Sequence, residues 1–162
     1  MIYILFIVFI FFVIWLLNFI SYRVINKIIF ISQKWDLNIC CGKTDGGGVN
    51  ADIYQHIDLP NFVKIEDIYN LPFKDNQFNS VICSHTMEHV DDPDRFFIEL
   101  SRVGKEVTIV VPPIYDIAAN LNFIEHKWVF LCLKKKHNTL PLYYKLPFSD
   151  FIQKKIGQRI HA

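Results

Sequence analysis

The stretch that decides the fold is residues 78–113, which read FNSVICSHTMEHVDDPDRFFIELSRVGKEVTIVVPP. Residues 78–84 and 107–111 are short apolar runs, and the second is rich in β-branched residues and ends at two prolines. Both runs are therefore predicted to be buried strands. Between them, Asp92 and Pro93 form a helix start, and apolar residues follow at helical spacing. A strand, a helix and a second buried strand predict a parallel α/β unit.

Three shorter strands are predicted upstream of this unit, at residues 37–40, 49–53 and 62–65. A glycine-rich run at residues 42–48 separates the first two, and it is predicted to be a loop because consecutive glycines support neither helix nor strand well. We therefore expect an α/β fold, a Rossmann-like, mostly parallel sheet with flanking helices. In such sheets, ligands bind beyond the carboxyl ends of the strands.

The N-terminal segment reads MIYILFIVFIFFVIWLLNFI and contains no charged side chain. Because about twenty helical residues span roughly 30 Å of hydrocarbon, it predicts one transmembrane helix. Arg23 and Lys27 follow it, and positive charge on this flank indicates the cytoplasmic side. No basic leader or small-residue cleavage site is visible, so we expect an uncleaved anchor. The alternative, a helix buried within the domain, would need more apolar surface than a small domain offers.

The length of 162 residues allows one compact domain with an appendage. Net charge is +1 with acids and bases mixed, so no nucleic acid partner is expected. The four cysteines lack zinc-type spacing, so they are expected to be reduced thiols and no metal site is predicted. The expected division is a transmembrane anchor over residues 1–22, a basic juxtamembrane connector over 23–34, an α/β domain over 35–130 and a divergent C-terminal segment over 131–162.

Polar groups follow the predicted strands, where a ligand is expected. The loop at residues 42–48 lets a ligand approach the backbone closely, but it lacks the GK[ST] ending of a phosphate-binding P-loop. Asp52 ends the second strand, in the position of an acid that accepts from ribose hydroxyls. Asp67 follows the third strand and suits an exocyclic amine. Taken singly, each aspartate is also typical of a turn or a helix cap.

The ordered string of these pieces resembles class I S-adenosylmethionine-dependent methyltransferases of the type 11 group, over residues 37–113. Residues 67–78 read DIYNLPFKDNQF, similar to a D-x-x-x-LPF-x-D-x-x-F segment of that family. Residues 88–93 read EHVDDP and resemble its EHV-x-DP segment, and residues 102–104 match its Arg-Val-Gly stretch. The combination is specific, although no single motif is.

The resemblance implies an enzyme that moves a methyl group from S-adenosylmethionine to a lipid, quinone, glycan or small-metabolite acceptor. The acceptor is expected to be a free small molecule or a lipid-linked one. The chain is expected to be a single-pass membrane protein that is anchored through residues 1–22 and has its methyltransferase-like domain in the cytoplasm. The residues expected to bind the cofactor are Cys41, Gly42, Asp52, Asp67, Ile68 and Ser84. The residues expected to act in catalysis are His85 and His126. The alternative for His126 is a surface histidine beside two charged residues.

The first glycine-rich motif departs from the family pattern LD-x-G-C-G-x-G. Residues 37–44 read LNICCGKT, so Asn38 replaces the usual acid and Cys40 replaces the first glycine. The chain over residues 42–49 is also too short for the helix that usually follows the first strand. These departures keep a second interpretation open, a non-catalytic, methyltransferase-like, membrane-anchored binding or scaffold protein. A nicotinamide-dependent enzyme is disfavoured because no GxGxxG motif is present.

Overall fold

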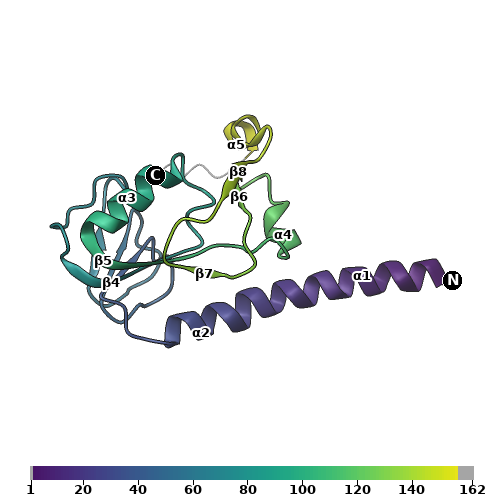
Figure 1. The fold of residues 1–162 in the computed structure, drawn as a ribbon, viewed down its shortest axis with the longest axis horizontal. Coiled ribbons are helices and arrows are strands. Elements are labelled where there is room, and N and C mark those ends of the chain that lie inside the picture. The colour runs from purple at the N-terminus through teal and green to yellow at the C-terminus, as the bar shows by residue number, and fades with distance from the viewer. Residues whose placement is uncertain (1, 157–162) are drawn as a thin grey trace.

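A long N-terminal helix projects from the domain in the computed structural model, which describes residues 2–156 (Figure 1). It consists of α1 (Ile2–Phe19), a π-helical segment η1 (Ile20–Ile25) and α2 (Asn26–Ile31), joined without a break. Most apolar side chains of α1 are exposed. Among the described residues, one helix is long and apolar enough to cross a membrane, and it covers Tyr3–Ile31.

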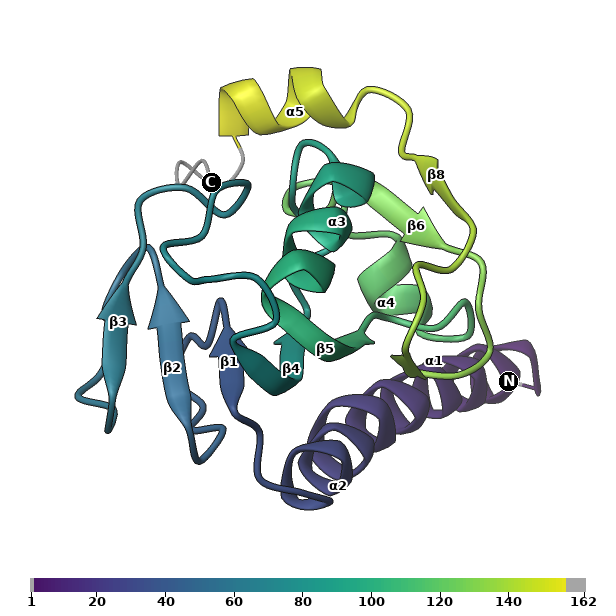
Figure 2. The same cartoon turned by 60° about the vertical axis from the view of Figure 1, so that its left-hand side comes forward.

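The centre of the domain is a six-stranded sheet with the order β3-β2-β1-β4-β5-β7 (Figure 2). Neighbours among β1 to β5 pair in parallel, and β7 is antiparallel to β5. This arrangement confirms the predicted Rossmann-like, mostly parallel sheet. The strands are β1 (Leu37–Ile39), β2 (Val49–Asp52), β3 (Phe62–Lys64), β4 (Phe78–Ser84), β5 (Gly104–Val110) and β7 (Lys136–His137).

The C-terminal segment contributes a strand to each of the two sheets, although no strand was predicted there from the sequence. β7 extends the main sheet, and a second, two-stranded antiparallel sheet pairs β6 (Trp128–Phe130) with β8 (Tyr143–Lys145). The described chain ends with α5 (Ser149–Ile156). The last part of the predicted segment 131–162, residues 157–162, lies outside the described residues.

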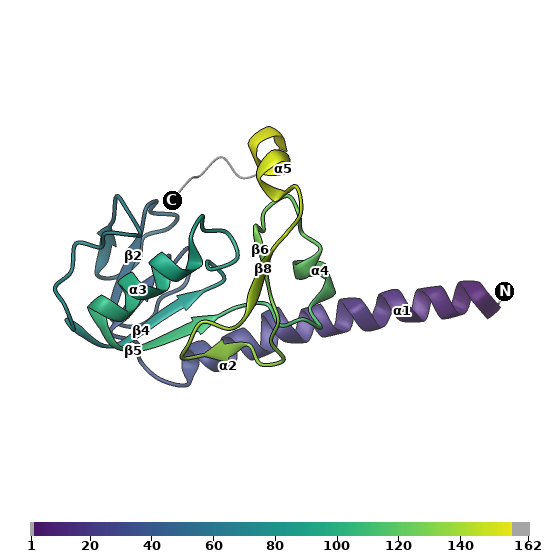
Figure 3. The same ribbon diagram turned by 45° about the horizontal axis from the view of Figure 1, so that its top comes forward.

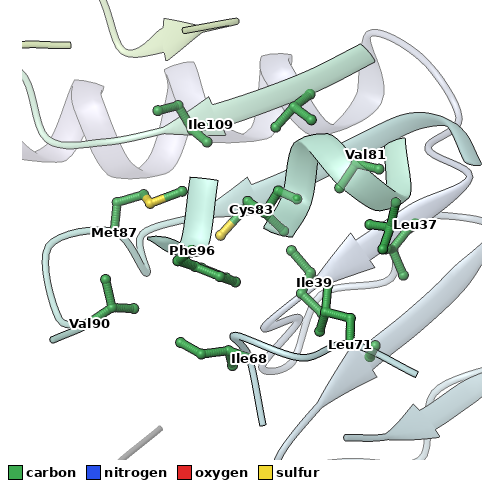
Figure 4. Close-up of a cluster of buried hydrophobic side chains, with 14 of the residues drawn as sticks. Leu37, Ile39, Ile68, Leu71, Val81, Cys83, Met87, Val90, Phe96 and Ile109 are labelled. Atoms are coloured by element: carbon green, nitrogen blue, oxygen red, sulfur yellow. The ribbon is translucent and has the colours of Figure 1, made fainter. Parts of the chain in front are cut away.

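One face of the main sheet is covered by α3 (Pro93–Val103), which starts as predicted. The Asp92 side chain caps its N-terminus by accepting from the backbone N–H of Arg95 at 3.0 Å, and Pro93 occupies the first turn. The apolar stripe of the helix then buries Phe96 among side chains of β1 and β4 (Figure 4). The strand–helix–strand unit therefore forms as the sequence indicates.

The opposite face is covered by the C-terminal part of the long helix. Ile82 of β4 and Val110 of β5 pack with Ile29 of α2 and with Trp35, which follows the helix. A parallel sheet with helical connections is normally covered on both faces. Because residues 40–48 connect β1 to β2 without a helix, α2 supplies the cover that a crossover helix would otherwise give.

Polar contacts also tie the long helix to the domain. Nζ of Lys135 donates to the backbone oxygen of Ser21 at 3.0 Å and to its hydroxyl at 2.7 Å. Nδ2 of Asn18 donates to Oδ1 of Asp116 at 2.9 Å, near the short helix α4 (Ile117–Asn120), which lies beside α1 (Figure 3). Burial lowers the pKa of Lys135 to about 8. The helix is thus joined to the domain from Asn18 onward, whereas the division into anchor and connector with respect to a membrane stays a prediction.

Candidate active site

The candidate site lies where the strand order reverses, at the carboxyl ends of β1 and β4. β1 pairs with β2 on one side and with β4 on the other, and the connections leave the two strand ends in opposite directions along the sheet. Such a switch point is where doubly wound sheets bind ligands. The segments that follow these two strands, residues 40–48 and 84–92, therefore form the site.

Two buried asparagines fix the loop after β1. Nδ2 of Asn38 donates to the backbone oxygen of Thr44 at 2.7 Å and to Oδ1 of Asn50 at 3.1 Å. Asn50 in turn accepts from the backbone N–H of Gly46 at 2.9 Å and donates to Asp45 at 2.9 Å. Asn38, which stands where the family pattern has an acid, therefore acts as a donor that holds the loop.

The backbone of this loop takes left-handed conformations at Cys40, Gly42 and Gly47. Cys40 has φ +52° and Gly42 has φ +54°. A side chain at +52° is strained, so the cysteine occupies a position that favours glycine. At Gly42, nothing lies within 4 Å of where a Cβ would be, and its N–H donates to Oδ2 of Asp52 at 2.8 Å. The predicted glycine and aspartate are thus brought together.

A cavity of about 650 Å³, here called the loop cavity, lies between this loop and the long helix. It is lined by the predicted residues Cys41, Gly42, Ser84 and His85. On the helix side it is bounded by Tyr22, Asn26 and Phe30, among others. The loop cavity therefore unites the carboxyl ends of β1 and β4 with a roof from the N-terminal helix.

The other predicted cofactor residues stand apart from the lining of the loop cavity. Asp52 reaches it only through its bond to Gly42. Oδ1 of Asp67 accepts from the backbone N–H of Tyr69 at 2.7 Å, which is the local turn that the alternative interpretation describes. The side chain of Ile68 is fully buried in the hydrophobic core (Figure 4).

A second cavity of about 410 Å³, the histidine cavity, adjoins the first and shares Tyr22 and His85 with it. The rings of these two residues stack at a centroid distance of 4.7 Å. His85 has φ +54°, a strained conformation for a side chain of this kind. Its Nδ1 lies 3.0 Å from Oε1 of Glu88, and its Nε2 lies 3.3 Å from Oδ1 of Asn26. His85 is therefore clamped at the boundary of the two cavities.

Glu88 and His126 give the histidine cavity its electrostatic character. Burial alone would raise the pKa of Glu88, but the hydrogen bond and the charge of His85 outweigh it, and the pKa falls to about 2. Burial lowers the pKa of His126, so its ring is neutral at neutral pH. The backbone oxygen of Glu88 accepts from Lys127 N–H at 2.7 Å, which brings His126 to this cavity. The two predicted catalytic histidines, His85 and His126, thus line one cavity, and His126 is 5% exposed rather than a surface residue.

Several residues of the site had no signal in the sequence. Asn18, Tyr22 and Asn26 belong to the long helix, whose composition indicates only a membrane anchor. Glu88 and His89 do have a signal, since they belong to the EHVDDP segment that resembles the family, where ordering the helix start and taking part in catalysis are equal alternatives. Their side chains line the histidine cavity.

Residues 50–111 match the sequence model of a family described as Methyltransferase domain. The matched segment begins in β2 and ends just beyond β5. It therefore includes Asp52, Asp67, Ser84 and His85 and leaves out the loop after β1. No curated protein matches the chain.

Several solved structures are similar to this chain, among them proteins of three organisms. A SAM-dependent methyltransferase of Aquifex aeolicus is 17% identical, with a TM-score of 0.42, over 57% of this chain and 66% of that one. A Thermotoga maritima protein described as a SAM-dependent methyltransferase, possible histamine N-methyltransferase, is 14% identical with a TM-score of 0.49, over 86% and 73%. A Pyrococcus horikoshii protein is 17% identical with a TM-score of 0.47, over 84% and 79%. The chain spans just under two thirds of the Aquifex protein.

Proposed function

We propose that this chain, whose residues 50–111 match the model of the methyltransferase domain family, transfers a methyl group from S-adenosylmethionine to an acceptor at a membrane. The observation that carries the proposal is the pair of adjoining cavities at the carboxyl ends of β1 and β4. The loop cavity would take the cofactor, and the histidine cavity would take the acceptor. His85 and Tyr22 stand between them, where the methyl group would pass.

The residues around the loop cavity fit a nucleoside cofactor. Its volume of about 650 Å³ lies within the usual range of small-molecule sites. The open space beside Gly42 allows a ligand to approach the backbone closely. Asp52 lies next to the lining of this cavity through its bond to the Gly42 N–H, and its Oδ1, which has only a 3.5 Å contact with the Tyr54 N–H, would accept from a ribose hydroxyl. The resemblance implies the same role for Asp52, with Asp67 near the adenine amine.

Bound S-adenosylmethionine supplies an electrophilic methyl group on a sulfonium sulfur. The protein contributes position and, where the acceptor must lose a proton, a base. The neutral ring of His126 in the histidine cavity suits proton acceptance, and His85 lies at the boundary that the acceptor would face. The clamp of Glu88 and Asn26 on the His85 ring would keep its orientation fixed during transfer.

We further propose that α1 anchors the protein in a membrane and that the acceptor is a lipid, quinone, glycan or small metabolite reached there. The histidine cavity is lined by Asn18 and Tyr22, at the end of the uncharged stretch of helix. The short helix α4 contacts α1, and apolar side chains in and near α4 are exposed. Arg23 and Lys27 favour a cytoplasmic domain. The apolar side chains near α4 are Ile114, Ile117, Leu121 and Ile124.

Calorimetric titration of S-adenosylmethionine into the full chain in lipid nanodiscs tests the cofactor part of this proposal. We expect saturable binding, and we expect Asp52→Asn to weaken it by about tenfold, because a charge-assisted hydrogen bond is lost. The matched control is Asp58→Asn, at an exposed aspartate of the β2–β3 connection. A folded protein that shows no binding at about 1 mM cofactor, the upper end of usual Michaelis constants, would exclude the enzyme.

A non-catalytic binding or scaffold protein is the second candidate, and the strained Cys40 and the donor role of Asn38 favour it. Membrane fractions incubated with radiolabelled S-adenosylmethionine separate the two candidates. Labelled acceptor that depends on His85 supports transfer. Cofactor binding without any labelled product supports the scaffold.

A further inference from the structure

We infer that Glu88, His89 and His126 form a binding site for a divalent transition-metal cation in the histidine cavity. One ligand atom from each of the three residues lies within 4.8 Å of the others. All three side chains line the same cavity. This site lies outside every role assigned above to S-adenosylmethionine.

The donor set suits a particular class of metal. Two imidazoles and one carboxylate form catalytic sites for zinc, and the same set with open positions suits other divalent first-row ions. Zinc holds such ligands at about 2.0–2.2 Å, so they lie roughly 3.3 Å apart in a tetrahedral site. To reach this spacing from 4.8 Å, the side chains must move by about an ångström or two, and the histidine cavity leaves room for that movement. Three protein ligands leave a fourth position open.

The carboxylate of Glu88 is the strongest evidence for a missing partner. The side chain is 1% exposed, and Oε1 is held by Nδ1 of His85 at 3.0 Å. Oε2 is also buried, and among residues 2–156 it has no hydrogen-bond partner. A buried charged oxygen without a partner is costly, and a cation bound there removes this cost.

The surroundings fix the other ligands as a metal site requires. Nδ1 of His89 lies 2.9 Å from the backbone oxygen of Glu125, so Nδ1 carries the proton and Nε2 is left with its lone pair. The rings of His89 and His126 meet nearly perpendicularly, with centroids 4.8 Å apart. The bond from Lys127 N–H to the Glu88 backbone oxygen holds the two chain segments together. His85 donates to the Glu88 carboxylate, and the backbone oxygen of Glu125 accepts from His89, so both of these ligands are held by a further hydrogen bond.

The open position of the cation faces the cavity proposed for the acceptor, and this step rests on the proposed function. A bound cation polarises an oxygen ligand and lowers its pKa, so the site selects an acceptor with a hydroxyl group. The acceptor oxygen would bind the metal and lose its proton to solvent water in the cavity, because both ring nitrogens of His85 already face oxygen acceptors. His126 is then a metal ligand and not the base. The site thereby narrows the acceptor from any small metabolite to an oxygen nucleophile.

The test titrates Zn²⁺ into the full chain in nanodiscs after chelator treatment. We expect one tight site per chain. Its affinity for Zn²⁺ should fall roughly hundredfold or more in His126→Ala and in His89→Ala, since losing a ligand costs more affinity than losing a residue that only supports a ligand. The control is His56→Ala, at an exposed histidine of the β2–β3 connection, which should bind as the wild type does. The absorption spectrum of the Co²⁺ form should show nitrogen and oxygen ligation without thiolate bands.

Three outcomes would each overturn the metal site. The first is the absence of tight Zn²⁺ binding, the second is equal binding by His126→Ala and His56→Ala, and the third is thiolate bands in the Co²⁺ spectrum. Because His126→Ala could fail to fold, Glu88→Gln serves as a second variant of similar size. It should also lose the site while its circular dichroism spectrum stays native. S-adenosylmethionine binding, measured on the same samples, separates the two proposals: its retention without metal binding rejects the metal site alone.

Discussion

The loop cavity and the histidine cavity lie side by side on one edge of the sheet, share Tyr22 and His85, and are built by different chemistry. The loop cavity is shaped by backbone conformation and by neutral amide bonds from Asn38 and Asn50. The histidine cavity is shaped by ionisable side chains around Glu88. Substitutions around the first should therefore act through backbone geometry and packing, and those around the second through charge and metal.

The largest expected effect on the loop side of this comparison comes from Gly48→Ala. Gly48 lies where the loop enters β2. A Cβ there would lie 2.3 Å from the backbone oxygen of Trp35 and 2.5 Å from that of Asp36, and backbone atoms cannot move away cheaply. We expect the free energy of unfolding of the full chain in detergent micelles to fall by about 3 kcal/mol or more. Gly42→Ala is the control, with open space but φ +54°, and should cost about 1 kcal/mol. Equal losses would contradict the packing account.

Asn38→Asp tests whether an amide rather than an acid orders the loop. The substitution restores the residue of the family pattern, yet the carboxylate would face two acceptors, the Thr44 backbone oxygen and Oδ1 of Asn50. Because Asn38 is 1% exposed, we expect a loss of about 2–3 kcal/mol in denaturant unfolding at neutral pH. Asn70→Asp, on an exposed turn, should change little. A more stable Asn38→Asp protein would show that the loop prefers the acid.

Lys135→Met tests the support behind Tyr22, which divides the two cavities. Nζ of Lys135 lies 4.2 Å from the centre of the Tyr22 ring, and burial lowers its pKa from 10.5 to about 8. Between these pH values the unfolded chain binds the proton and the folded chain does not, so wild-type stability rises with pH in this window and is lost as pH falls to about 8. Lys135→Met should remove this rise, which we expect to be about 2 kcal/mol or less.

Thermal unfolding of the wild type and of Lys135→Met, measured from pH 7 to 11 in the same detergent, gives this difference. Other groups that titrate at high pH cancel between the two proteins. Parallel curves would mean that Lys135 is solvated in the folded chain.

The smallest expected effect belongs to Cys40→Gly. Glycine relieves the left-handed backbone at φ +52° but removes a partly buried side chain that packs against the core. We expect a net stabilisation of about 1 kcal/mol or less, with tighter binding of S-adenosylmethionine measured by calorimetry. Weaker binding would indicate that the thiol contributes to the loop cavity. Either result measures how far the altered glycine-rich motif limits cofactor binding.

The regular elements of the domain were readable from the sequence because each has a strong local signal. The β-branched run ending at Pro112, the cap at Asp92 and the glycine-rich loop predicted β5, α3 and the β1–β2 connection. The C-terminal strands were not predicted, because β7 has two residues and β8 has three, and such short strands are defined by their partners rather than by their own periodicity.

The sequence by itself determined the α/β core, an apolar N-terminal helix and the order of the motifs that match a methyltransferase domain. Only the tertiary structure decided that the helix also covers the second face of the sheet and roofs the loop cavity. It alone placed His126 beside Glu88 and His89, 37 positions after His89 in the chain. Strands and helices follow from local periodicity, whereas cavities and ligand clusters follow from distances between distant segments, which a pattern along the chain does not contain.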